Sequence, residues 1–458
     1  MKMPLAPQEL STYLDHHFSC DCGKEHYAPL KDVCIRAGAL DELPHIVKKQ
    51  GFQSLFLVCD KITYDIAAKK CMTILENAGV DARCEILSHT GFDEATLGEL
   101  LIHMPEDCDL VVAVGTGAIN DMVRYFSFRM HRPFFTVATA APMDGFASSL
   151  AVLNINNLKT SIEAQTPSAI IGDTDILIGA PYRMIAAGLG DLLGKATCIC
   201  DWKLSRIINH EHYCERVVEL VEKSVHDVLA VADRAKDRDP AVLGSIMEGL
   251  VLTGVAMSLY GNSRPASGCE HHMSHYWEMM FEQAGKRPVP HGIQVGVGTV
   301  LILKLVEALL QKDISFDAAR DAAKSFCYKD WADQIVQAYG PAAPGIIAME
   351  EAAHKNETNG RLSRIHTIEE HWEEITTLLQ SLPRSETIIG LLRSLDAPCF
   401  PSEIGIDKDL LRNTFLYCKE VRARYTILQM IWDLGMLEPL AAEVMREIPS
   451  TEGGDGND

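Results

Sequence analysis

Three histidines fall within five positions of the segment GCEHHMSHYWE, at His271, His272 and His275. Residues three or four apart share one face of a helix, so His275 would align with His271 and, roughly, with His272. Two imidazoles on one face could hold a transition metal or relay a proton to a substrate. Taken alone, however, histidines of this kind are by default solvated or hydrogen-bonded within a core. The zinc-peptidase pattern HExxH is absent, which excludes that class of metal site.

A carboxylate and a further histidine narrow these alternatives. Asp191 is the one charged side chain in the apolar run GLGDLLG, and a buried carboxylate costs free energy unless it is paired or ligated. His291 begins the glycine-rich apolar segment HGIQVGVG, where its ring would project beside a helix end. One oxygen from Asp191 with nitrogens from His271 and His291 suits a divalent transition metal that keeps positions open for substrate. This donor set favours a catalytic site over a closed structural one.

A glycine-containing turn, GTGAIND at residues 115–121, directly follows the apolar stretch 109–114. Glycines between a strand and a helix let a pyrophosphate approach the backbone, and the helix N-terminus offers N–H groups and positive potential. Neither the GxGxxG dinucleotide fingerprint nor a Walker loop is present, and a tight turn alone would also explain the glycines. The position after a buried strand favours phosphate binding.

Two further loops follow apolar strands and would line the same crevice. Asp60 ends the run QSLFLVC, where its carboxylate could accept hydrogen bonds from an adenosine ribose or could cap the next helix. The segment TAAPMDGFAS at residues 139–148 follows the strand predicted over 134–138. Its Thr, Asp and Ser side chains could contact a ligand at the carboxyl ends of the strands, or could be turn residues.

The elements that would position these residues change character along the chain. Short apolar runs at 53–59, 109–114 and 134–138 alternate with helical patterns, which predicts an α/β doubly wound, Rossmann-like domain over residues 1–178. Long helical patterns then dominate, which predicts an all-helical domain over 179–450. Residues 451–458, TEGGDGND, are small and acidic and are predicted to form a disordered tail.

The composition excludes several classes of function. Lys and Arg number 42 against 63 Asp and Glu, a formal charge of −21, and we find no basic stretch, so no nucleic-acid partner is expected. No uninterrupted apolar run reaches about 18 residues, so no membrane span is predicted, and the N-terminus lacks the apolar core of a signal peptide. The 14 cysteines are mostly scattered singly, which indicates reduced thiols and a cytoplasmic protein.

The segment CDCGKEH at residues 20–26 is an exception among the cysteines. Cys20 and Cys22 with His26 could bind a metal ion, but no second ligand pair follows at zinc-ribbon spacing. A surface loop is therefore the favoured interpretation.

Five motifs, taken in their order along the chain, resemble one family. GTGAIND, TAAPMDGFAS, GLGDLLGK, SRPASGCEHHMSH and HGIQVGVGT occur in the order seen in sn-glycerol-1-phosphate dehydrogenases. These enzymes belong to the group of iron-dependent alcohol dehydrogenases, glycerol dehydrogenases and dehydroquinate synthases. The resemblance runs from about Gly38 to Thr299, and the motifs around EHHMSHYWEM and CDCGKEH are most similar to the bacterial, AraM-type branch. It implies a dehydroquinate synthase-like architecture, NAD(H) or NADP(H), one divalent metal ion and a homodimer.

The resemblance also implies roles for individual residues. Asp191, His271 and His291 would hold the metal, which would be nickel or zinc, with iron as a further option. Substrate would contact Asp144, Asp191 and His275, and we expect His275 and Asp144 to be the catalytic residues. The implied nucleotide-contacting residues, with the first glycine of the turn, are Asp60, Gly115, Gly117, Ala118, Ile119, Asn120, Asp121, Thr139, Ala140 and Ser148. Lys195 stands where iron-dependent alcohol dehydrogenases have a histidine, which would leave room for a bidentate substrate.

The reaction implied by this resemblance is the reversible reduction of dihydroxyacetone phosphate to sn-glycerol 1-phosphate. A metal would polarise the C2 carbonyl while a hydride arrives from nicotinamide. His275, expected near its ordinary pKa of about 6.5, would relay the proton or merely orient the substrate. Arg264, just before the histidine-bearing helix, is our hypothesis for the residue that binds the substrate phosphate. The alternatives are a glycerol dehydrogenase-type polyol oxidoreductase and, ranked lower, a dehydroquinate synthase-like lyase or a non-catalytic nucleotide-binding regulator.

Overall fold

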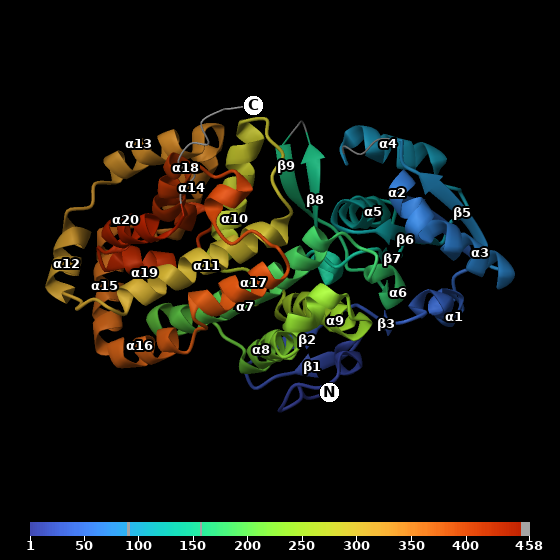
Figure 1. Cartoon of the computed structure of the whole chain (residues 1–458), viewed down its shortest axis with the longest axis horizontal. Helices are drawn as coiled ribbons and strands as arrows, with labels where there is room; N and C mark the ends of the chain where they lie inside the picture. Colours follow the sequence, from blue (N-terminus) through green and yellow to red (C-terminus); the bar gives the residue numbers. More distant parts are fainter. Residues whose placement is uncertain (89–91, 156–157, 450–458) are drawn as a thin grey trace. The chain divides into compact units, whose positions relative to one another are not determined.

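Residues 1–88, 92–155 and 158–449 are described by a computed structural model of the chain (Figure 1). They form two compact units, Met1–Leu192 with Cys214–Ser263, and Leu193–Tyr213 with Arg264–Asp458. The long helix α7 (Tyr182–Asn209) contributes to both units. The disordered tail predicted over 451–458 lies outside the described residues.

The first unit is built on a six-stranded parallel sheet with the strand order β3-β10-β7-β6-β4-β5. Its strands are β3 (Asp32–Arg36), β4 (Ser54–Cys59), β5 (Asp81–Ile86), β6 (Leu110–Gly115), β7 (Phe134–Ala138) and β10 (Ala169–Asp173). Strand β4 pairs with β5 on one side and with β6 on the other, so the strand order reverses between β4 and β6. In doubly wound sheets, ligands bind beyond the carboxyl ends of the strands at such a switch point. The predicted fold class is confirmed.

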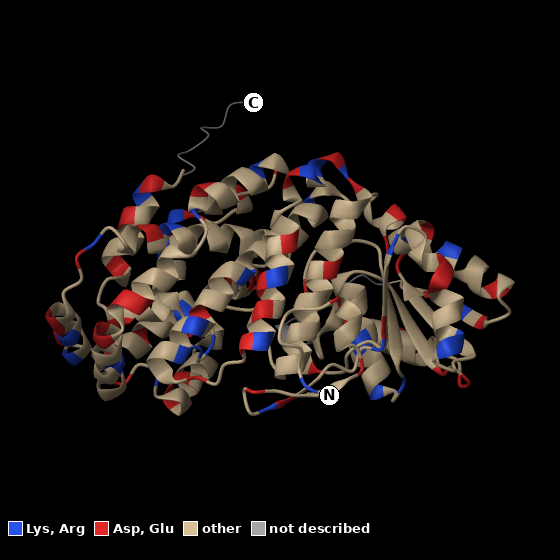
Figure 2. Cartoon of the chain, turned by 90° about the horizontal axis from the view of Figure 1, so that it is seen from below, with Lys and Arg blue, Asp and Glu red and all other residues tan. Residues whose placement is uncertain are grey.

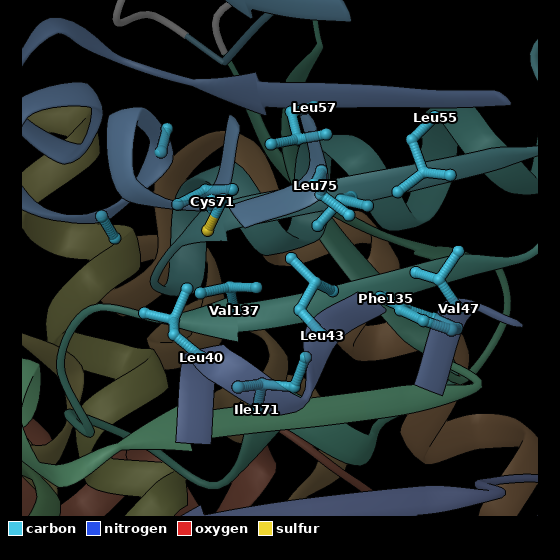
Figure 3. Packing of buried hydrophobic residues seen from close by; sticks show 14 of the residues in the cluster. Leu40, Leu43, Val47, Leu55, Leu57, Cys71, Leu75, Phe135, Val137 and Ile171 are labelled. Carbon is cyan, nitrogen blue, oxygen red and sulfur yellow. The ribbon is translucent and has the colours of Figure 1, made fainter. Parts of the chain in front are cut away.

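Alternate residues of β4 enter cores on opposite faces of the sheet, because successive side chains of a strand point in opposite directions. Leu55 and Leu57 pack with side chains of α1 (Leu43–Lys49) and α3 (Lys69–Asn77), as Figure 3 shows. Phe56 and Val58 pack with side chains of α4 (Glu94–His103) and α5 (Gly117–Arg129). Burial on both faces explains why the run SLFLVC is continuously apolar.

Two helices beyond the predicted domain boundary at residue 178 belong to the first unit. They are α8 (Glu215–Leu229) and α9 (Pro240–Tyr260), which pack against each other. Helix α9 also packs on β3 and on the short helix α6 (Thr174–Leu177). The compact units therefore differ from the division at 178, because α9 is apolar on nearly every side and finds its partners beside the sheet.

Several strands were not apparent in the sequence pattern. The hairpin β1 (His17–Ser19) and β2 (Glu25–Tyr27) is too short to show alternation, and β8 (Leu150–Ile155) pairs with β9 (Leu158–Glu163) in a second antiparallel hairpin. Strand β3 (DVCIR) is only half-buried, so it lacks the continuous apolar run of the inner strands.

The described part of the second unit contains helices and no strand. Beside the C-terminal part of α7, its α-helices are α10 (Cys269–Gln283), α11 (His291–Leu309), α12 (Phe316–Lys324), α13 (Tyr328–Tyr339), α14 (Ala343–Ala353), α15 (Thr358–Glu370), α16 (Trp372–Gln380), α17 (Ser385–Ser394), α18 (Lys408–Tyr417), α19 (Ile427–Asp433) and α20 (Leu437–Glu447). Helix α11 packs against α10, α17, α19 and α20, which explains its nearly uniform apolar sequence.

Two helices of the described chain, α9 and α11, are long and apolar enough to cross a membrane by length and composition alone. In their most apolar windows, 72% and 83% of the residues are buried inside the protein, as expected of core helices. Figure 2 shows Lys and Arg interspersed with Asp and Glu along the helices.

Candidate active site

The turn between β6 and α5 offers the N–H groups of a helix N-terminus. Thr116 is the N-cap of α5, and its side chain makes no capping hydrogen bond. An added Cβ at Gly117 would meet little besides Met143, whose Cε would lie 3.4 Å away. At Gly115 an added Cβ would lie 2.6 Å from Ile119 Cδ1, so the packing of the turn itself requires that glycine. The turn therefore fits an anionic group at Gly117 and the exposed Ala118.

Asp60 follows β4 and caps α2 (Lys61–Thr63) in a capping box. The Thr63 N–H donates to Asp60 Oδ1 (2.7 Å), and the Asp60 N–H donates to Thr63 Oγ1 (3.0 Å). The helix-cap alternative is thus confirmed. Among the described residues, Thr63 donates hydrogen bonds to Oδ1 of Asp60 and none donates to Oδ2. Oδ2 can therefore still accept from a ribose hydroxyl.

Three residues expected to contact the nucleotide direct their side chains into the protein instead. Ile119 is part of the core that α5 forms with the sheet. Asn120 is fully buried, and its Oδ1 accepts a hydrogen bond from Thr136 Oγ1 (2.6 Å). Asp121 forms an ion pair with Arg124 one turn along α5. These side chains position the loop, so any contact of the three residues with the nucleotide would come from their backbone groups in the first turn of α5.

Arg124 positions the candidate substrate segment, a role that the sequence interpretation missed. Its buried guanidinium donates to the carbonyl oxygens of Gly145 (2.5 Å), Phe146 (3.0 Å) and Leu150 (2.8 Å). These bonds hold the segment after β7 against α5. Nothing in the local sequence distinguishes Arg124 from a surface arginine, because its acceptors are backbone atoms more than twenty positions away.

The segment that follows β7 lies beside the glycine turn, since the Thr139 N–H donates to the Gly115 carbonyl (3.2 Å). Thr139 and Ala140 are buried, whereas Ser148 Oγ accepts a hydrogen bond from the Leu150 N–H (3.0 Å), a turn role. The buried Asp144 donates its backbone N–H to Asp191 Oδ2 (2.9 Å). The structure thus brings together two of the predicted substrate contacts, Asp144 and Asp191.

In the second unit, α10 and α11 bring three histidine rings together. The ring centroids lie 5.2 Å apart for His271 and His291, 5.5 Å for His275 and His291, and 6.1 Å for His271 and His275. His271 Nδ1 lies 2.7 Å from Glu270 Oε1, and His291 Nδ1 lies 3.1 Å from Ser274 Oγ. A proton held on Nδ1 leaves the Nε2 lone pair for a metal. The two proposed imidazole ligands are therefore oriented as metal ligands usually are.

Glu270 and Glu278 are orienting carboxylates that the sequence interpretation passed over. Glu270 is fully buried; burial alone would raise its pKa, but hydrogen bonding to His271 and to the Gly268 N–H holds that pKa below its ordinary value. Glu278 lies 3.3 Å from His291 Nδ1. Both glutamates lie in the same helix as His271 and His275, and this proximity in the sequence could have indicated their role.

Burial lowers the pKa of His275 to about 4, although its hydrogen bond to Glu278 acts in the opposite direction. This corrects the expected value near 6.5, so His275 is neutral at neutral pH. A neutral imidazole both donates and accepts one hydrogen bond, which suits a group that orients a hydroxyl or passes a proton on. His272 is fully buried and its pKa also falls well below the ordinary value, first through burial and then through nearby cations.

Arg264 does not offer an open anion-binding group. Its guanidinium is buried and forms a bidentate pair with Glu211, with Nε to Oε1 and Nη2 to Oε2 both at 3.0 Å. Nη2 also donates to the carbonyl oxygens of Asp201 and Tyr425. These contacts direct Nε and Nη2 to acceptors inside the second unit and argue against the hypothesis that Arg264 binds the substrate phosphate.

The Glu270→Gln variant is expected to lose roughly 10- to 100-fold in metal affinity or in kcat/KM, because the amide can still accept from His271 but lacks the charge that makes the ligand more basic. Metal titration and steady-state kinetics measure the two quantities. Glu357→Gln is the matched control, since Glu357 makes the same 2.7 Å contact to an exposed ring, His354. Equal behaviour of both variants would contradict an orienting role for Glu270.

Comparison with known proteins places this site in a family. Residues 34–181 match the family model described as iron-containing alcohol dehydrogenase. A glycerol-1-phosphate dehydrogenase (NAD(P)+) of Halalkalibacterium halodurans is 29% identical over 89% of this chain and 94% of its own length. The enzyme of that name from Bacillus subtilis (strain 168) is 30% identical over 89% of this chain and 93% of its own. The chain belongs to the glycerol-1-phosphate dehydrogenase family.

The wider fold group of these glycerol-1-phosphate dehydrogenase relatives is visible in solved structures. A 1,3-propanediol oxidoreductase superimposes with a TM-score of 0.60 at 15% identity, covering 91% of this chain and 98% of that one. At this identity the likeness shows the fold alone. An NAD(P) cofactor and a metal ion are consistent with the family, and the predicted resemblance is confirmed over more of the chain than the motifs span.

Proposed function

We propose that the chain is an NAD(P)-linked dehydrogenase that reversibly reduces dihydroxyacetone phosphate to sn-glycerol 1-phosphate. The observation that carries the proposal is the cluster of His271, His275 and His291, with the first and last oriented through Nδ1 by buried or half-buried groups. Homology to enzymes named for this substrate, over nine-tenths of the chain, supports the phosphorylated triose over glycerol itself.

A divalent metal would be held by Asp191, His271 and His291. The donor set is one carboxylate and two neutral imidazoles, and Lys195 adds no ligand because its Nζ donates to the Ala266 carbonyl (3.1 Å). When bound, such a metal supplies Lewis-acid polarisation of the substrate carbonyl. Nickel and zinc both suit these donors, and iron remains an alternative. The chain's own contribution is to fix the orientation of these three ligands.

The nucleotide would lie at the switch point between β4 and β6. Its pyrophosphate would meet the N-terminus of α5 at Gly117 and Ala118, and its ribose would meet Asp60 and the Thr139–Ala140 segment. The carboxylate of Asp60 favours an unphosphorylated ribose, whereas the neighbouring Lys61 would tolerate a phosphate. We therefore propose that both NADH and NADPH are used.

Asp144 and His275 would meet the substrate hydroxyl groups. The neutral His275 orients the hydroxyl adjacent to the reacting carbon and passes its proton on, and Asp144 accepts a hydrogen bond from the substrate. We further propose a cytoplasmic homodimer, in keeping with the reduced cysteines and with the resemblance.

Arg422 is a better candidate than Arg264 for the substrate phosphate. It lies near enough to His275 for its charge to lower that pKa, and burial alone lowers its own pKa. Within the described ranges no carboxylate forms an ion pair with the Arg422 guanidinium. It also lines an open cavity of about 650 Å³ together with Arg424.

The Arg422→Ala variant is expected to raise KM for dihydroxyacetone phosphate roughly 10- to 100-fold, because a charge-assisted hydrogen bond to phosphate is lost. KM for unphosphorylated dihydroxyacetone should change little. Arg412→Ala is the control, since Arg412 is an exposed arginine paired with Glu438. An equal change for both substrates would show that Arg422 does not bind the phosphate.

The activity itself is tested by NADH and NADPH oxidation with dihydroxyacetone phosphate and with dihydroxyacetone, before and after chelation. We expect rapid, chelator-sensitive turnover of the phosphorylated ketone and a chiral product that is sn-glycerol 1-phosphate. Preference for dihydroxyacetone would favour the polyol oxidoreductase. Absence of turnover by metal-loaded protein would favour the non-catalytic regulator.

A further inference from the structure

Four potential metal ligands of the first unit converge at the N-terminal hairpin, away from every residue assigned above. The turn between β1 and β2 carries Cys20 and Cys22, and β2 carries His26. Cys214, the N-cap residue of α8, joins them from far along the chain. One ligand atom from each of these residues lies within 4.8 Å of all the others. Figure 1 shows the hairpin beside α8 and α9.

The separations match the edges of a tetrahedral site. Cys20 Sγ lies 3.7 Å from Cys214 Sγ, and His26 Nε2 lies 3.3 Å from Cys22 Sγ and 3.4 Å from Cys214 Sγ. With Zn–S of about 2.3 Å and Zn–N of about 2.0 Å, a tetrahedral ion separates two sulfurs by about 3.8 Å, and sulfur from nitrogen by about 3.5 Å. The observed distances agree with these values to within a few tenths of an ångström.

The histidine ring is oriented from its far side, as in metal sites. His26 is buried, and its Nδ1 donates to the Leu259 carbonyl (2.7 Å) in the last turn of α9. This bond fixes the proton on Nδ1 and turns Nε2, with its lone pair, toward the three sulfurs. The turn that carries both cysteines is tight: the Gly23 N–H donates to the Cys20 carbonyl (3.0 Å), and Gly23 has a φ of 87°.

We infer that Cys20, Cys22, His26 and Cys214 bind a zinc ion in a closed structural site, separate from the proposed catalytic metal. Three thiolates and one imidazole in a tetrahedron are a usual donor set for structural zinc. Four protein ligands leave no position for a substrate. Zinc binding at these four residues does not depend on the proposed reaction.

A second cysteine pair shows that sulfur proximity alone is insufficient. Cys59 and Cys84, on the paired strands β4 and β5, also have their sulfurs 3.7 Å apart. No histidine or third thiol is grouped with them among the residues that the structure describes. The converging third and fourth ligands are what distinguish the hairpin cluster.

The ion would fasten the hairpin to the start of α8 and, through His26, to the end of α9. That end of α9 supports the candidate substrate segment: Ser258 Oγ donates to the Ala147 carbonyl (3.1 Å), and an added Cβ at Gly254 would lie 3.0 Å from the Asp144 carbonyl oxygen. Loss of the ion is therefore expected to lower Tm, and to lower activity only secondarily.

Cobalt-substituted full-length protein gives a direct test. Thiolate ligands produce sulfur-to-cobalt charge-transfer absorption in the near ultraviolet and intense visible bands of tetrahedral cobalt, whereas a site of carboxylate and imidazoles has no sulfur band. We expect the sulfur band in the wild-type chain. We also expect zinc in the purified protein that resists a chelator sufficient to abolish activity, and that a thiol-specific mercurial then releases.

The ligand variants assign the band to residues. Cys20→Ser and Cys214→Ser should lose it, His26→Cys should retain it with a fourth thiolate, and Cys327→Ser, at an exposed cysteine, is the matched control. If the ligand variants do not fold, the wild-type spectrum and the mercurial-released zinc decide the question. Absence of the sulfur band from the cobalt-loaded wild-type chain, or a native Cys20–Cys214 disulfide found by mass spectrometry, would overturn the inference.

Discussion

The His271→Ala variant is expected to lose the proposed catalytic metal and, with it, on the order of 10³-fold in kcat/KM for dihydroxyacetone phosphate. His271 would supply one of the two proposed imidazole ligands, and its Nδ1 lies 2.7 Å from Glu270 Oε1. Removal of the ring also leaves the Glu270 carboxylate buried without that partner. Metal content per chain and steady-state kinetics measure both losses.

The appropriate control is His366→Ala, at an exposed histidine of α15 whose Nε2 lies 3.4 Å from the exposed Glu370 carboxylate. It should retain metal and activity. The hairpin zinc should persist in both variants, so metal content should fall by one equivalent only in His271→Ala. Full activity of His271→Ala would show that the metal assignment is wrong.

The Gly188→Ala variant is expected to destabilise the chain by about 3 kcal/mol or more, near the upper end of the usual cost of overpacking. An added Cβ would lie 2.0 Å from the Ala141 carbonyl oxygen, a backbone atom that cannot rotate away. Either α7 or the segment after β7 must move, and both carry residues proposed to contact substrate, Asp191 and Asp144. We expect a lower midpoint in chemical denaturation and a reduced kcat/KM.

Gly98→Ala makes the same substitution in another helix, and its effect on stability should have the opposite sign. An added Cβ at Gly98, within α4, meets no atom within 4 Å. Replacement by alanine should therefore stabilise the chain by about 0.5–1 kcal/mol through helix propensity and a less flexible unfolded state. A Gly188→Ala protein as stable as Gly98→Ala would contradict the close approach of α7 to the loop.

Local sequence was sufficient for the inner strands β4, β6 and β7 and for the grouping of the histidines, whereas the inner strand β10 was missed. The runs SLFLVC and LVVAVG are buried on both faces, so continuous hydrophobicity identified them, and helical spacing aligned His271 with His275. Edge strand β3 and the hairpins were missed because half-buried or short strands carry no such signal.

Tertiary structure decided which polar residues have partners inside the protein. Arg264 looked like an anion-binding residue until Glu211, fifty-three positions earlier, was found in bidentate contact with it. The pKa of His275 departed from its ordinary value because of burial, which spacing does not report.

The hairpin site shows the same limit most clearly. The sequence by itself determined that Cys20, Cys22 and His26 lie close enough to share a ligand, since a short turn cannot separate them far. Only the tertiary structure supplied the fourth ligand, because α8 returns Cys214 to His26 across 188 positions of chain. Long-range closure of this kind depends on how α8 and α9 pack beside the sheet, and no local pattern of residues encodes that packing.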